Sequence, residues 1–279
     1  MKAYSFAGVT LDRPLILGIV NVTPDSFSDG GHFLGLEAAI AHGRKLAADG
    51  ADFLDIGGES TRPGAAPVTI EEEIGRVVPV IRALAADGLR LSIDTRHSAV
   101  MRAALDAGAI IINDISALEG DPDSMAVAAA SNASIVLMHM QGQPATMQQA
   151  PHYDDAPREV HDYLAGRIKA CLKAGLAKDR LCVDPGIGFG KALGHNLDIL
   201  SHLDVFQDLG VPVLLGVSRK SVIGAMSRGE PADRRLGGSI AAALAGLEKG
   251  VQILRVHDVA ETVQAVAVWH AIRSSKNKG

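Results

Sequence analysis

The sequence predicts an α/β protein, a (β/α)8 TIM barrel with a short N-terminal hairpin. Short apolar runs recur along the chain, and each run stops abruptly at one polar residue. Segments with helical spacing lie between these runs, and several of them end at a glycine. Strands that alternate with helices in this way form parallel sheets, and about 250 residues suffice for an eight-stranded barrel. The 279 residues contain no linker-like segment, so we expect a single domain spanning residues 1–279.

The first long apolar run is expected to open the barrel. Residues 15–20 suit a strand buried on both faces, and the run changes at Asn21 into a loop rich in Pro, Gly and Ser. Upstream, residues 4–11 are centred on Gly8 and predict a hairpin that plugs the bottom of the barrel. The same change from apolar to polar recurs at seven later positions, which are Asp55, Asp94, Asn113, His139, Asp184, Ser218 and His257.

The remaining elements follow from the spacing of apolar residues and from turn signals. Strands are expected at 15–21, 53–57, 91–94, 110–114, 134–139, 180–184, 213–216 and 253–257. Helices are expected at 37–49, 70–87, 98–107, 122–130, 159–174, 196–209, 220–227, 234–249 and 261–273. Ser98 is the expected N-cap of the third helix, and Glu71, Glu72 and Glu73 are expected on the solvated first turn of the second.

Composition and charge narrow the classes of function. Hydrophobic residues make up 47% of the chain and the net charge is -5, which argues against binding to nucleic acid because no basic face would neutralise phosphates. The N-terminus has too short an apolar region for a signal peptide, and no run approaches the length of a membrane span. We therefore expect a cytoplasmic protein without membrane contact. Cys171 and Cys182 are expected to be buried thiols rather than a disulfide or metal ligands.

The polar residues at the strand ends predict where the site lies. Sites in TIM barrels are built at the C-terminal ends of the strands, so these side chains converge around one mouth. A carboxylate accepts two parallel N–H bonds, whereas Asn and Lys donate to ring nitrogens and a carbonyl, which together suits a flat heterocycle. The polar set with these properties is Asp94, Asn113, Asp184 and Lys220.

The last strand predicts an anion pocket. Arg255 and His257 alternate along it, so both side chains point the same way, toward Asn21 and the pair Thr61 and Arg62. Two phosphates would also favour binding of a divalent ion, for which Asn21 is a candidate oxygen ligand. The alternative left open is a structural ion pair of Arg255, with His257 capping the last helix.

The glycine-rich segment 184–191 resembles a phosphate-binding loop but departs from its pattern, because Ala192 follows Lys191 where that loop needs Ser or Thr. Its glycines instead allow the backbone to approach a ligand, with Phe189 as a wall of the pocket.

Taken together and in order, seven motifs resemble those of the dihydropteroate synthase family. They are NVTPDSFSDGG (21–31), DIGGESTRPGA (55–65), SIDT (92–95), IND (112–114), DPGIGFGK (184–191), SRKS (218–221) and RVHD (255–258). One departure is Val222, where many members carry an aromatic residue. The resemblance implies a pterin-binding barrel of folate biosynthesis that condenses 6-hydroxymethyl-7,8-dihydropterin diphosphate with 4-aminobenzoate. It also implies a sulfonamide target, small-molecule substrates and a homodimer.

The resemblance implies a role for each matching residue. The pterin would contact Asp94, Asn113, Met138, Asp184, Phe189 and Lys220. The diphosphate would contact Asn21, Thr61, Arg255 and His257, with Mg²⁺ held at Asn21. The aminobenzoate would contact Phe27, Arg62, Pro63 and Ser221. The residues expected to carry catalysis are Asp94, Lys220, Arg255 and His257.

The expected mechanism is SN1-like, with Asp94 stabilising a pterin methylene cation after the diphosphate leaves. Two other functions are compatible with the pterin contacts. One is a methyltetrahydrofolate methyltransferase that serves a corrinoid, and the other is a catalytically silent paralogue that binds pterin or regulates a partner enzyme.

Overall fold

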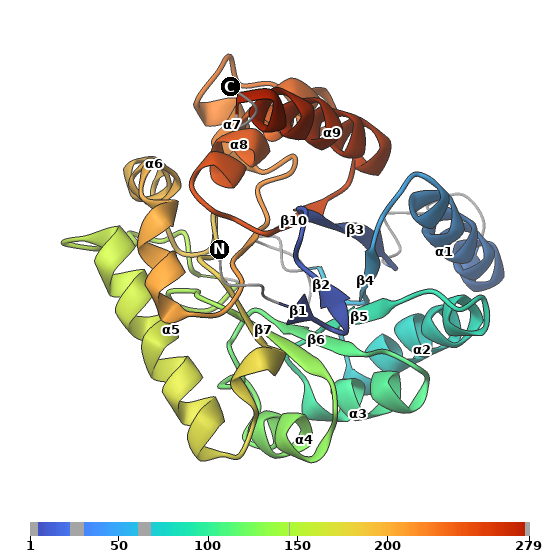
Figure 1. Ribbon diagram of the computed structural model, residues 1–279. Coiled ribbons are helices and arrows are strands. Elements are labelled where there is room, and N and C mark those ends of the chain that lie inside the picture. The colour runs from blue at the N-terminus through green and yellow to red at the C-terminus, as the bar shows by residue number, and fades with distance from the viewer. Residues whose placement is uncertain (1–4, 23–30, 61–67, 145, 277–279) are drawn as a thin grey trace.

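The computed structural model describes residues 5–22, 31–60, 68–144 and 146–276. Within this part of the chain, eight parallel strands form one sheet, with helices around the outside (Figure 1). The strands are β3 (Leu15–Asn21), β4 (Phe53–Gly57), β5 (Leu91–Asp94), β6 (Ile111–Asp114), β7 (Ser134–Met138), β8 (Leu181–Asp184), β9 (Leu214–Leu215) and β10 (Ile253–Val256). Their order in the sheet is β8-β7-β6-β5-β4-β3-β10-β9, and a parallel bridge between Val183 and Val213 joins its two ends. The TIM barrel expected from the sequence is confirmed.

The outer layer consists of the helices between the strands. They are α1 (Gly31–Ala48), α2 (Ile70–Ala86), α3 (Ser98–Asp106), α4 (Ser124–Ala130), α5 (Ala156–Lys173), α6 (Leu193–Ser201), α7 (Ser221–Ala225), α8 (Leu236–Glu248) and α9 (Val259–Lys276). Short 3-10 helices are η2 (Lys178–Arg180), η3 (Leu203–Leu209) and η4 (Ala232–Arg234). Of the helices in the described ranges, none is long and apolar enough to cross a membrane.

Two of the differences from the expected helix boundaries have a clear structural reason or consequence. Ser98 is the first residue of α3 rather than its N-cap, which is His97. The Ser98 N–H instead donates to Asp121 Oδ2 at 2.8 Å, so a carboxylate from the next loop takes the capping role. The expected helix 196–209 divides at His202 into α6 and η3.

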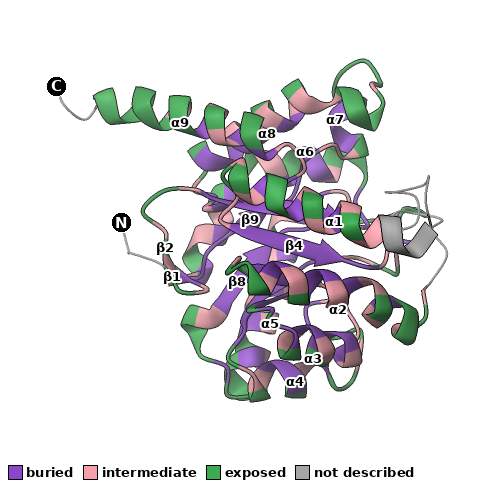
Figure 2. Ribbon diagram, turned by 90° about the vertical axis from the view of Figure 1, so that its right-hand side faces the viewer, coloured by how far each residue is buried: buried purple, intermediate pink, exposed green. Residues whose placement is uncertain are grey.

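The N-terminal hairpin consists of β1 (Ser5–Phe6) and β2 (Val9–Thr10). Figure 2 places it at the end of the barrel opposite to the one toward which β4 points. Phe6 is 2% exposed and packs edge-on against Phe53, with ring centroids 6.4 Å apart. The inner layer that they cap contains Leu15, Leu17, Ile111, Val136, Cys182, Leu214 and Ile253. The hairpin therefore plugs the bottom of the barrel, as the sequence predicted.

A larger apolar layer lies between the strands and the helices, and it contains outward-facing strand residues such as Val20, Ile56 and Ile93. The barrel strands are buried except at Asn21, Asp94 and Arg255, which are partly exposed, whereas the exposed residues lie mainly in loops and on the outer faces of the helices (Figure 2). Both cysteines are buried free thiols, Cys171 on α5 and Cys182 on β8, as expected. With the bottom closed and both layers filled, the C-terminal ends of the strands are where a ligand can approach.

Candidate functional site

The mouth of the barrel is organised around Arg255, which lies on β10. Its Nε donates to Asp55 Oδ2 at 2.6 Å, and its Nη2 donates to Asp94 Oδ2 at 2.6 Å. Asn113 Nδ2 donates to the same Asp55 oxygen at 3.0 Å. The second oxygen, Asp55 Oδ1, is buried without a hydrogen-bond partner among the described residues. Four neighbouring elements thus contribute one hydrogen-bonded polar cluster, in which Asp55 is the most deeply buried member.

Asp55 is therefore a site residue that the sequence analysis underestimated. We expected it at the mouth, but gave it no part in binding or catalysis. The FLDIGG segment carried the signal, since a carboxylate in the middle of an otherwise apolar strand needs a buried cation or donor to offset its desolvation.

The charges of this cluster depend on one another. Burial raises the pKa of Asp94 to about 7, although Arg255 opposes the shift. Asp55 and Glu73 raise it further through charge repulsion. Burial also opposes the positive charge of Arg255, but Asp55 and Asp94 hold the pKa of its guanidinium above the usual range. Arg255 therefore stays charged, while Asp94 is poised to change its protonation state near neutral pH.

Arg255 and His257 occupy different surroundings. The structural ion pair that we kept as an alternative for Arg255 is present in the structure. His257 donates its backbone N–H to Ser218 Oγ at 3.2 Å, and its Nδ1 lies 3.1 Å from the same oxygen. Helix α9 begins at Val259, and the carbonyl of Asp258 accepts the first-turn N–H of Thr262. His257 is thus tied to the β9–α7 loop.

A second polar group lies beside the first. Lys220 Nζ donates to the carbonyl of Ile187 at 2.5 Å and lies 4.7 Å from the centroid of the Phe189 ring. Burial lowers the pKa of Lys220 to about 8, while the charge of Asp184 opposes the shift. Burial likewise raises the pKa of Asp184, against the effects of Lys220 and the Gly186 N–H. The end of β8 and the loops after β8 and β9 therefore bring together a carboxylate, an amino group and an aromatic ring.

Two glycines show how closely these groups approach one another. A Cβ atom built onto Gly216 would lie 3.6 Å from Asp184 Oδ2 and 3.8 Å from Arg255 Cβ. A Cβ atom built onto Gly57 would lie 3.7 Å from Asp94 Oδ2 and 3.8 Å from Asn21 Oδ1. The two polar groups and Asn21 thus share one mouth.

The other expected site residues are distributed as follows. Met138 is buried at the end of β7, where it pairs in register with Asp184. Ser221 is exposed and is the first residue of α7. Phe27, Thr61, Arg62 and Pro63 lie outside the described residues.

The expectation for Glu73 is wrong, although Glu71 and Glu72 are exposed as predicted. Glu73 is 0% exposed and its Oε2 lies 2.8 Å from His97 Nδ1. A Cβ atom built onto Gly58 would lie 3.0 Å from Glu73 Cγ. The backbone after β4 therefore lies directly on this side chain, because Gly58 offers no side chain to hold it away.

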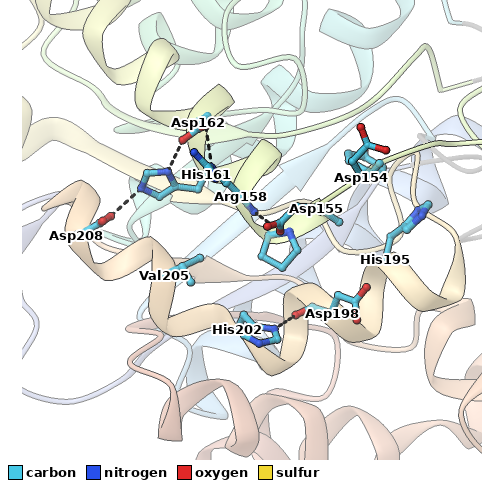
Figure 3. Close-up of a pocket in the computed structure, with 13 residues that line it drawn as sticks. Asp154, Asp155, Arg158, His161, Asp162, His195, Asp198, His202, Val205 and Asp208 are labelled. Carbon is cyan, nitrogen blue, oxygen red and sulfur yellow. Dashed lines mark hydrogen bonds and ion pairs between the residues drawn. The ribbon is translucent and has the colours of Figure 1, made fainter.

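A separate pocket of about 740 Å³ lies outside the barrel, between the start of α5, α6 and η3 (Figure 3). Within it, His161 Nδ1 lies 3.0 Å from Asp162 and its Nε2 lies 2.8 Å from Asp208. No polar strand-end residue of the mouth lines this pocket. Across the described ranges, no group of three or more His, Cys, Asp or Glu side chains is arranged to hold a metal ion.

Known proteins resemble this chain in sequence and in fold. Residues 17–257 match the family model described as "Pterin binding enzyme". A dihydropteroate synthase of Escherichia coli is 47% identical over 99% of this chain and 98% of its own length. A solved structure of the Xanthomonas albilineans dihydropteroate synthase with 4-aminobenzoic acid is 53% identical, with a TM-score of 0.90 over 96% of each chain. Another from that organism, in complex with 7,8-dihydropteroate, is 48% identical, with a TM-score of 0.85 over 96% of each chain.

The family model covers every described residue of the mouth, and the relatives align along nearly their whole length. The chain therefore belongs to the pterin-binding enzyme family, among the dihydropteroate synthases.

Proposed function

We propose that this chain condenses 6-hydroxymethyl-7,8-dihydropterin diphosphate with 4-aminobenzoate, giving 7,8-dihydropteroate and diphosphate. The observation that carries the proposal is the shared mouth, in which the Asp94–Arg255 ion pair lies beside the Asp184–Lys220 group. Such a mouth provides polar contacts for a heterocycle, next to a cation that binds a leaving anion. Family membership supports the same reaction.

The pterin occupies the side of the mouth formed by β5 to β8. Asp184 accepts N–H bonds from the amidine-like edge of the ring, and Lys220 donates to a ring nitrogen or carbonyl on the opposite edge. Asn113 and Asp94 complete the polar contacts, and Phe189 and Met138 supply apolar walls. The burial of Met138, Asn113 and Asp184 supports this assignment, because a heterocycle is bound most strongly where water is excluded.

The diphosphate occupies the side of the mouth at β10. Arg255 uses two of its five N–H groups on Asp55 and Asp94, so the guanidinium has further donors for phosphate oxygens. His257 and Asn21 flank it from the neighbouring strand ends, and Thr61 adds a hydroxyl. Ser221, Phe27, Arg62 and Pro63 form the aminobenzoate side.

The chemistry proceeds through a pterin methylene cation. The bond between the methylene carbon and the diphosphate oxygen breaks, and the electron pair leaves with the diphosphate. Arg255 and His257 offset the charge that develops there, and Asp94 stabilises the cation that remains. The amine nitrogen of 4-aminobenzoate then bonds to the methylene carbon and loses a proton.

Mg²⁺ accompanies the diphosphate in this proposal, with Asn21 as its protein ligand. The half-buried Asn21 side chain has its Oδ1 near the Asp94 carboxylate, as the distances around Gly57 indicate. One neutral oxygen fits Mg²⁺, which keeps several waters and takes other ligands from substrate phosphates. Bound there, the ion would neutralise charge on the departing diphosphate.

The assembly is a homodimer in the cytoplasm. An apolar groove of about 630 Å³ between α6, α7 and α8, with Leu197 43% and Met226 39% exposed, supports association with a second copy. Two free thiols suit a reducing compartment. Light scattering on the purified protein measures the mass, and a monomer at micromolar concentration would contradict the dimer.

The deciding experiment measures diphosphate release from the pterin diphosphate, with and without 4-aminobenzoate and with and without Mg²⁺. We expect release coupled to 7,8-dihydropteroate formation, and loss of both when Mg²⁺ is chelated. Tight pterin binding without release would overturn the synthase function and favour a silent binder. Methyl transfer from methyltetrahydrofolate to a corrinoid would instead establish the methyltransferase.

A further inference from the structure

Lys191 is a buried lysine for which the mechanism above has no use. It ends the glycine-rich segment after β8, and it is only 2% exposed. Its Nζ donates to the carbonyls of Gly186 at 2.9 Å and Phe189 at 3.0 Å, and it lies 3.3 Å from the carbonyl of His139. It also donates to His139 Nδ1 at 2.9 Å. Four acceptors from two adjacent strand ends therefore surround one amino group.

The imidazole of His139 is suited to accept this bond. Burial lowers the pKa of His139 to about 3, and the neighbouring charge of Lys191 lowers it further. The ring is therefore neutral, and in the tautomer protonated at Nε2 its Nδ1 accepts a hydrogen bond from Lys191. Tyr163 packs edge-on against the ring, with centroids 4.9 Å apart, which fixes its orientation.

The two carbonyls from the glycine-rich segment belong to one tight turn. The Phe189 N–H donates to the Gly186 carbonyl at 3.1 Å, which closes a four-residue turn over 186–189. Lys191 therefore bonds both ends of this turn from the inside. Lys220 donates to the carbonyl of Ile187, in the middle of the turn, from the side of the mouth. One turn is thus held between two lysines.

The turn also has no room to move toward β7. Gly186 has a φ of +68°, and a Cβ atom built there would lie 1.9 Å from the carbonyl oxygen of His139. A Cβ atom built onto Gly190 would lie 2.2 Å from the carbonyl oxygen of Gln141. The backbones of the two segments are therefore in direct contact, and Lys191 cross-links them at this contact.

Burial of an amino group in this position costs desolvation free energy, which its hydrogen bonds must offset. None of its hydrogen-bond partners among the described residues is a carboxylate, and burial lowers the pKa of its amino group well below the usual value, although Asp184 opposes the shift. An apolar side chain of the same length would fill the space, but it would leave the carbonyls of the turn without a donor. The bonds of Lys191 determine the shape of the turn, and the turn carries the groups that face Lys220.

We propose that Lys191, together with His139, is the positioning residue of the pterin subsite. Its amino group locks the turn 186–189 against the end of β7, and so fixes the Ile187 carbonyl and the Phe189 ring relative to Asp184 and Lys220. This inference rests on the proposed function, because it assumes that pterin binds against the turn. Lys191 itself touches neither substrate.

The first test is Lys191→Met, which keeps the length of the side chain and removes the donor. The control is Lys169→Met, which removes an exposed lysine on α5. Circular dichroism and thermal unfolding verify the fold. We expect the KM for the pterin diphosphate to rise by roughly 10-fold or more, with kcat and the KM for 4-aminobenzoate changed less than about 3-fold, since uniform pterin binding is lost. A folded variant with an unchanged pterin KM, or with an equal loss for both substrates, would overturn the proposal.

A second pair of variants decides the matter if Lys191→Met does not fold. His139→Leu removes the acceptor, whereas His139→Asn places an oxygen near the position of Nδ1. We expect the leucine variant to raise the pterin KM and the asparagine variant to restore it to within about 3-fold of the wild type. Equal pterin KM values for both variants would overturn the inference. A wild-type protein that binds no pterin would refute the proposed function itself, so the two failures are distinguishable.

Discussion

Arg255 Nη2 donates to Asp94 Oδ2 at 2.6 Å, although the two residues are 161 positions apart in the chain. The same guanidinium donates to Asp55, so one cation bridges carboxylates from two adjacent strands. This shared ion pair places Asp94 at the mouth with its charge partly offset, and it links the cation-stabilising group to the group that receives the leaving anion.

Replacing Asp94 tests that arrangement directly. We expect Asp94→Asn to lower turnover by more than ~10²-fold, the loss typical of removing one electrostatic stabiliser of the transition state. The fold should remain, because Arg255 keeps its bond to Asp55. Steady-state kinetics compare this variant with Asp106→Asn, which changes an exposed residue of α3. Near-normal turnover would remove Asp94 from the mechanism.

The activity should have a narrow pH optimum. Asp94 must be ionised to stabilise a cation, and its pKa is raised to about 7. Lys220 must be protonated to donate to the pterin, and its pKa is lowered to about 8. We therefore expect kcat/KM to rise with pH through about 7 and to fall above about 8. A profile that is flat across this range would contradict both roles.

Stability should also depend on pH through Asp94. Its folded-state pKa lies above the unfolded value of 3.8, so its contribution is complete below pH 3.8 and is lost as pH rises through about 7. As pH rises from 3.8 to about 7, the free energy of unfolding of the wild type should therefore fall relative to that of Asp94→Asn. Urea unfolding of both proteins at several pH values measures the difference. A constant difference would mean that Asp94 does not titrate in this range.

Lys220 should contribute to pterin affinity. We expect Lys220→Ala to weaken the binding of a pterin by roughly 10-fold or more, because a charge-assisted donor is lost. Titration calorimetry measures the affinity, with Lys169→Ala as a control for loss of a lysine charge on α5. Unchanged pterin affinity in the Lys220 variant would refute its assignment to the pterin.

The turn at Gly186 should be intolerant of a side chain. Gly186→Ala combines a positive φ with a clash against the His139 carbonyl, so we expect a loss of more than ~2 kcal/mol in the free energy of unfolding. Gly166→Ala on α5 is the matched control, because its Cβ would meet nothing within 4 Å and should stabilise the helix by ~1 kcal/mol. Similar effects of the two substitutions would mean that the turn rearranges freely.

The order of the strands could be predicted from the sequence because each buried strand is a mainly apolar run with a polar residue in it or just after it. Residues 53–57 and 91–94 form strands with the expected bounds. The strand expected at 213–216 is shorter, with only Leu214 and Leu215 in the ladder. A short apolar run shows that a strand is buried, but the number of ladder residues depends on how the barrel closes.

The pairing of charges could not be predicted in the same way. Arg255 had several carboxylates within its expected reach, and its choice of Asp55 and Asp94 depends on the geometry of the closed barrel. Glu73 and Lys191 have ionisable side chains, which normally lie at the surface, yet both are buried against glycine backbones. The pattern of polar and apolar residues in the sequence does not distinguish such buried residues from solvated ones.

Strand β10 pairs with β3, which joins nearly opposite ends of the polypeptide. Arg255 leaves the ribosome 200 residues after Asp55 and 161 residues after Asp94, so both carboxylates are made long before their cation. Arrival of β10 then joins the two open edges of the sheet and brings a cation to the two carboxylates in the same step. A nascent chain that stalls before residue 253 would carry an unclosed sheet and two carboxylates without this cation. Completion of the barrel and assembly of the site are therefore a single event that depends on β10.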